Sequence, residues 1–133
     1  MAKMSFENHI MKQFDDELEE IRTRLMEMGG KVEQQLQNAI LAISNADSQL
    51  AEQVISEDQS VDAMEIDIDE ACILIIARRQ PAASDLRLVM MVTKAVNDLE
   101  RIGDEARKLA NQARVLGEER AASAGYPGVR HIA

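Results

Sequence analysis

The sequence of 133 residues has few aromatic side chains: no tryptophan, one tyrosine and two phenylalanines. Because 46% of the residues are nevertheless hydrophobic, the core must be built mainly from aliphatic side chains. This length and this hydrophobic fraction predict one folded domain and argue against a disordered chain.

Cysteine is nearly absent too, since Cys72 is the only one. A lone cysteine excludes an internal disulfide framework and a four-thiolate zinc site, so we predict a buried thiol. The apolar run around it, residues 71–77, is far shorter than the roughly 20 residues of a membrane span. Residues 1–18 lack the apolar core of a secretory signal. We therefore expect a cytoplasmic protein that meets a membrane only through partners.

Basic residues are outnumbered, with 15 Lys and Arg against 24 Asp and Glu, which gives a net charge of −9. This balance argues against a nucleic-acid partner, because binding to a phosphate backbone depends on clustered Lys and Arg. The excess of acid comes from one segment. Residues 47–77 contain nine acidic residues and no Lys or Arg.

Apolar residues recur every three or four positions in three segments, which is the pattern of helices that bury one face. The segments run from Phe14 to Ile43, with Ile21, Met28 and Val32 in the apolar row, from about residue 48 to residue 77, and from Leu86 to Leu116, with Ile102 in the apolar row. We predict an all-α fold, an antiparallel three-helix bundle with helices of about 30–37 residues. The third helix is expected to fade near Gly117, so that residues 1–117 form the bundle and residues 118–133 a linker.

Local signals predict where these helices begin and end. The first helix is expected to continue through Gly29 and Gly30, because the apolar pattern keeps its phase across them. Asp47 is a good N-cap for the second helix. Gln80 and Pro81 are expected to end it, since proline disfavours the α conformation in the preceding residue.

Four acidic residues lie along one face of the second helix: Asp58, Asp62, Glu65 and Asp69 are spaced by four, three and four. Like charges at these spacings cost about 0.2–0.5 kcal/mol per pair, so the face favours a compensating cation. Glu65 lies about 20° around the helix from Cys72 and therefore borders the apolar stripe.

The third helix carries a second acidic pair at the same spacing, Glu100 and Asp104, with Gly103 between them giving close access to the backbone. If the two pairs face each other, Glu65, Asp69, Glu100 and Asp104 surround one volume with oxygen ligands, which suits Mg, Ca, Mn or ferric iron. The alternative is a solvated acidic face with ordinary ion pairs. No histidine is close in sequence, which disfavours the di-iron chemistry of ferritin-like proteins.

Seven basic residues follow the acidic helix: Arg78, Arg79, Arg87, Lys94, Arg101, Arg107 and Lys108. Two interpretations are open. Charge balance favours pairing across the bundle with the acidic helix, and the alternative assigns the corner at Arg78 and Arg79 to a partner protein.

Three stretches strongly resemble the PhoU family of bacterial phosphate-signalling regulators: FDDELEEIRTRLMEMGGKVEQQLQNAI, MEIDIDEACILIIARRQPAASDLRLVMMV and NDLERIGDEARKLA. The resemblance covers residues 6–116. It implies a fold of two similar three-helix bundles, of which this sequence holds the first, with the second expected to begin close to Pro127. It also implies metal clusters, with iron or zinc among the ions, at Glu65, Asp69, Glu100 and Asp104, and the oxygen ligands would equally suit magnesium or manganese.

By the same resemblance we expect a non-enzymatic adaptor. Such a protein would repress the phosphate-starvation response by linking the ATPase of the Pst phosphate transporter to the sensor histidine kinase PhoR. Asp85, Arg87 and Arg101 would contact partners, with helix-dipole and salt-bridge roles as the alternative for Asp85 and Arg101. Loss of the second bundle predicts self-association as a homo-oligomer, most simply a dimer. The competing function is a carboxylate-bridged metalloprotein for metal storage or phosphoester hydrolysis.

Overall fold

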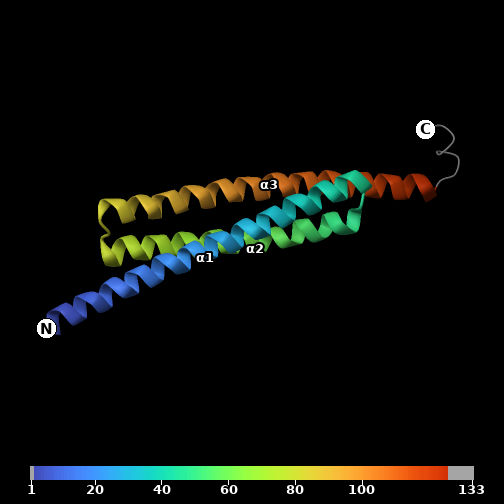
Figure 1. The fold of residues 1–133 in the computed structure, drawn as a ribbon. Helices are drawn as coiled ribbons and strands as arrows, with labels where there is room; N and C mark the ends of the chain where they lie inside the picture. Colours follow the sequence, from blue (N-terminus) through green and yellow to red (C-terminus); the bar gives the residue numbers. More distant parts are fainter. Residues whose placement is uncertain (1, 126–133) are drawn as a thin grey trace.

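The computed structural model describes residues 2–125 of the chain, and all but a short turn between each pair of helices is helical. Helix α1 spans Ala2–Asn45, α2 spans Ser48–Arg79 and α3 spans Ala83–Gly125. Figure 1 shows α2 running antiparallel to both α1 and α3, with α1 crossing the other two at an angle. Each helix contacts both others. The prediction of an all-α antiparallel three-helix bundle is confirmed.

Two of the helices are longer than predicted: α1 has 44 residues and α3 has 43, against 32 in α2. The expectation that the third helix fades near Gly117 is wrong, because α3 continues to Gly125. Residues 118–125 of the expected linker are thus helical, and residues 126–133 lie outside the described part. Gly117 serves packing instead. A Cβ there would lie 2.7 Å from the carbonyl oxygen of Ala46, so only glycine lets α3 pass the turn between α1 and α2.

The predicted helix signals are confirmed. Asp47 caps α2, with its Oδ1 accepting a hydrogen bond from the backbone N–H of Leu50 at 3.1 Å. Gln80 ends α2 in the left-handed region, at φ 44°, and its N–H donates to the carbonyl of Ile76. Helix α1 passes through Gly29 and Gly30 without a break.

The core of the three-helix bundle divides into two clusters. One is built from larger side chains, and its fully buried members include Met28, Ile68 and Val96. The other is dominated by alanine, with members from all three helices. Alanine side chains fill little space, so close packing of this cluster requires the helix backbones to approach one another closely.

One part of the predicted core of α3 is wrong. Ile102 and Leu116 are 42% and 45% exposed, whereas Gly103 and Ala110 are buried. The buried row passes through Gly103, and a glycine gives no hydrophobic signal in a sequence. The apolar spacing therefore predicts a buried Ile102, whereas the buried position is Gly103.

Cys72 is buried within α2, as predicted, and burial raises the pKa of its thiol. The apolar run around it belongs to an ordinary bundle helix. None of the three described helices has the length and hydropathy that a membrane span needs.

Candidate metal centre

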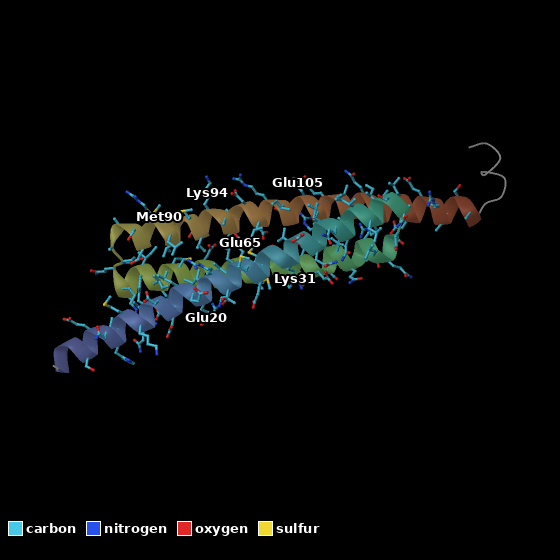
Figure 2. The ribbon with its side chains drawn as sticks, viewed as in Figure 1. Glu20, Lys31, Glu65, Met90, Lys94 and Glu105 are labelled. Atoms are coloured by element: carbon cyan, nitrogen blue, oxygen red, sulfur yellow. The ribbon has the colours of Figure 1, made fainter. Side chains whose placement is uncertain are left out.

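Three carboxylates from α2 and α3 lie close together. Asp62 and Glu65 come from α2 and Glu100 from α3, and one oxygen from each lies within 4.8 Å of the others. Figure 2 shows Glu65 between the two helices. Asp62 is exposed, while Glu65 and Glu100 are half-buried. The cluster is therefore open to solvent on one side and bounded by the bundle on the other.

The antiparallel direction of α2 and α3 decides which predicted residues meet. Glu65 and Glu100 lie at one level of the bundle. Four residues further on, Asp69 and Asp104 each lie about 6 Å along the axis from that level, in opposite directions. They are outside the cluster, and Asp62 takes the third place. Asp62 belonged to the acidic face recognised in the sequence, and its position one turn before Glu65 was the signal that could have found it.

Burial and the neighbouring carboxylates of Asp62 and Glu65 raise the pKa of Glu100 to about 8. Burial is the largest cause, followed by hydrogen bonds to the two acidic neighbours and repulsion from their charges. Without a cation, Glu100 therefore keeps its proton at neutral pH. A bound cation would compensate the carboxylates and displace that proton.

The residues present fit a hard cation. Glu100 Oε2 and Asp69 Oδ1 are buried without a hydrogen-bond partner among the described residues. The cluster offers only carboxylate oxygens, the donors that Mg, Ca, Mn and ferric iron prefer. Glu65 and Glu100 would hold the ion, with Asp62 beside them. The ion would supply the positive charge that this face lacks.

Asp58, the first residue of the acidic face of α2, has a different role. Asp58 is buried, accepts a hydrogen bond from Gln35 Nε2 at 3.3 Å, and lies 3.4 Å from Arg107 Nε. Asp104 lies 3.7 Å from the same guanidinium. Burial raises the pKa of Asp58 despite these partners. Arg107 thus supplies the cation for Asp58 and Asp104, which separates them from the three-carboxylate cluster.

The interpretation that the basic residues pair across the bundle with the acidic helix holds only for Arg107. Arg79 pairs with Glu17 of α1 at 2.8 Å, and Lys108 pairs with Glu105 of its own helix. The other four, Arg78, Arg87, Lys94 and Arg101, are exposed and form no ion pair with any described residue. Asp85 is half-buried in the first turn of α3.

Comparison with known proteins gives the family directly. Residues 25–113 match the PhoU domain, a range that contains Asp62, Glu65, Glu100 and Asp104. The chain belongs to the PhoU family. The resemblance noted in the sequence is confirmed.

The PhoU relatives are similar over almost all of this chain. It is 54% identical to the phosphate-specific transport system accessory protein PhoU homolog of Pseudomonas putida, over 98% of this chain and 51% of the relative. It is 56% identical to the accessory protein PhoU of Escherichia coli K12, over 85% and 47%. The chain spans about half the length of these curated relatives.

The fold is similar to a PhoU crystal structure as well. Superposition on PhoU from Pseudomonas aeruginosa gives a TM-score of 0.78 at 54% identity, covering 90% of this chain and 57% of that chain. The three-helix bundle described above is therefore a PhoU bundle.

Proposed function

We propose that this chain is an accessory protein of phosphate-specific transport that represses phosphate uptake and phosphate-starvation signalling. The observation that carries the proposal is the 54–56% identity to relatives named as accessory proteins of that transport system. The chain spans about half of each relative, and we propose that this half takes part in the activity of the whole protein.

In this proposal the chain works as a non-enzymatic cytoplasmic adaptor. It would contact the ATPase of the Pst transporter and the sensor kinase PhoR when phosphate is plentiful, with Asp85, Arg87 and Arg101 as contact residues. The exposure of Arg87 and Arg101 and their lack of an ion pair with described residues support this role. Self-association would use exposed apolar residues such as Ile66 and Ile73, which are 59% and 64% exposed.

The carboxylate cluster favours a second candidate, a metal-binding protein for storage or phosphoester hydrolysis. Glu65 and Glu100 would be ligands, joined by Asp62 and, for a larger cluster, Asp69 and Asp104. In the adaptor role a divalent or ferric ion at this site would hold α2 and α3 together and would take part in no reaction. A hydrolase would turn over a phosphoester, whereas an adaptor would not.

Complementation tests the accessory role. The chain is expressed in a bacterium that lacks its own PhoU, and a reporter of phosphate starvation is measured in phosphate-rich medium. We expect repression to return with the chain alone or with the second half of the Pseudomonas putida relative supplied beside it. Failure in both arms, with normal expression of the chain, would overturn the proposal. Pull-down with the Pst ATPase and the kinase identifies the partners.

A turnover assay separates the two candidates. The purified chain is analysed for bound metal and then assayed with a chromogenic phosphate monoester in the presence of Mg, Mn, Fe or Zn. Metal binding without turnover is expected. Stoichiometric metal together with turnover that disappears in Glu100→Gln would replace the adaptor by a hydrolase.

A further inference from the structure

Four basic residues form a straight row on the outer side of α3. Arg87, Lys94, Arg101 and Lys108 are all exposed and are spaced by seven residues. Seven residues turn a helix by about 700°, so each side chain lies only about 20° from the one before, and the row extends about 30 Å. Figure 2 shows Lys94 on the side of α3 that points away from α2. In a chain of net charge −9, this row is a local basic surface.

Most of this positive charge is uncompensated. Lys108 Nζ lies 3.4 Å from Glu105, but Arg87, Lys94 and Arg101 form no ion pair with any described residue. The acids on the same side of α3 are Asp98 and Glu105, both exposed. Four cations therefore face two carboxylates along this row.

An apolar row lies beside the basic one. Each cation is followed by an apolar residue, and the row continues one heptad further: Leu88, Ala95, Ile102, Leu109 and Leu116. Ile102 and Leu116 are 42% and 45% exposed, and Met91, which lies between Leu88 and Ala95 on this face, is 68% exposed. Leu88 and Arg22 of α1 line the same small cavity, which places the start of the row on the α1 side of α3. None of these five residues is fully buried, although Leu109 packs against the alanine-rich part of the core.

We propose that this face of α3, the basic row together with the apolar row, docks an amphipathic helix of a partner protein. That helix carries acidic residues at heptad spacing beside an apolar seam. Two helices that pack at about 20° keep such rows in register over several turns, and charges that flank an apolar seam select the partner. That a partner exists rests on the proposed adaptor role. That the partner helix is acidic rests on the charges of α3.

Charge also disfavours the simplest symmetric alternative. An antiparallel pairing of α3 with α3 of a second copy, centred on Ile102, would place one basic row against the other. Like charges in such positions oppose association. The net charge of −9 likewise opposes extended polyanions such as nucleic acids.

A designed peptide tests the surface directly. A four-heptad helix with leucines in its seam and glutamates in the flanking row is labelled and titrated with the chain, and fluorescence anisotropy is measured. A twin peptide carries lysine in place of each glutamate. We expect the glutamate peptide to bind, the lysine twin not to bind, and the binding to weaken as salt is added.

Matched variants locate the contact. The triple variant Arg87→Gln, Lys94→Gln, Arg101→Gln should weaken binding of the glutamate peptide about tenfold, since three exposed ion pairs are lost. The control Lys12→Gln, Lys31→Gln, Arg78→Gln removes the same charge from α1 and α2 and should leave binding unchanged. Ile102→Glu should weaken binding as well, because it places a charge in the apolar row. Circular dichroism and urea unfolding confirm that each variant is folded.

Several results would overturn the proposal. Equal binding of both peptides, or an equal loss in the control triple variant, would remove its charge specificity. Binding of phosphatidylglycerol vesicles that the basic-row variant loses, with no binding of the glutamate peptide, would make the row a membrane surface. Self-association that Ile102→Glu abolishes would make this face a homodimer interface. The titration reports on the surface and complementation on the accessory role, so the two failures are distinguishable.

Discussion

Gln35 of α1 donates a hydrogen bond from Nε2 to Oδ1 of Asp58 in α2 at 3.3 Å, and both side chains are buried. Gly103 of α3 lies against the pair, since a Cβ there would be 3.3 Å from Gln35 Oε1 and 3.5 Å from Asp58 Oδ1. Three helices thus meet at one buried polar contact. A buried polar pair is costly to leave unmatched, so this contact favours one register of the helices.

Breaking this contact should destabilise the bundle. We expect Asp58→Ala to lower the free energy of unfolding by about 1–3 kcal/mol, because the buried amide of Gln35 loses its acceptor and Arg107 its ion pair. Urea unfolding followed by circular dichroism measures the change. Glu52→Ala, at an exposed position of the same helix, is the control and should change stability little. Equal effects of the two variants would show that the contact contributes nothing.

Two glycine substitutions should have opposite signs. Gly117→Ala places a Cβ 2.7 Å from the backbone oxygen of Ala46 and should destabilise the chain by about 1–3 kcal/mol despite the better helix propensity of alanine. Gly30→Ala meets no atom within 4 Å and should stabilise it by about 1 kcal/mol. Thermal or urea unfolding gives both signs. A stabilising Gly117→Ala would contradict the close passage of α3 by the turn.

The metal-free chain should lose stability as the pH rises from about 4.5 to about 8. The pKa of Glu100 is raised to about 8, so across this range the folded state binds a proton that the unfolded state has released. Below about pH 4.5 both states are protonated and the contribution is complete. Glu100→Gln, which cannot ionise, should flatten this dependence. Urea unfolding at several pH values in the presence of a chelator measures it, and an unchanged slope in the variant would refute the assignment to Glu100.

Glu17 should give the opposite pH dependence. Its hydrogen bond with Arg79 lowers the pKa of Glu17, so the folded state holds the proton less tightly than the unfolded state. The contribution is present above the ordinary pKa of a glutamate and is lost as the pH falls through the lowered value. Wild type and Glu17→Gln should therefore converge in stability in acid and differ at neutral pH. A constant difference at all pH values would count against the pair.

Metal binding should depend unequally on the four acids predicted from the sequence. Glu100→Ala should abolish binding of Mn or Fe, because Glu100 is the carboxylate that α3 contributes to the three-carboxylate cluster. Asp104→Ala should reduce it less, because Asp104 faces Arg107. Elemental analysis after dialysis, with isothermal titration of the metal-free protein, measures both. Unchanged metal content in Glu100→Ala would remove α3 from the site.

Much of the fold could be predicted from local sequence. The apolar spacing that gave Ile21, Met28 and Val32 a common face depends only on the 3.6-residue turn of a helix, and all three are buried. The cap at Asp47 likewise depends on a side chain and a backbone N–H three residues apart. The prediction that Ile102 is buried is wrong because the buried position beside it is Gly103. The missing side chain of Gly103 leaves the space that Gln35 and Asp58 occupy.

The sequence by itself determined that this chain is acidic, that its excess acid lies in one helix, and that Glu65 borders the apolar face of that helix. Only the tertiary structure decided which acids meet. In antiparallel helices, equal steps along the two chains lead away from each other, so Asp69 and Asp104 separate while Asp62 joins Glu65 and Glu100. Asp58, identical in type and neighbouring in sequence, is instead compensated by Arg107. Side-chain type and spacing identify the acidic residues that could form a site. The direction of the helices and the position of each residue along the bundle axis decide which of them come together.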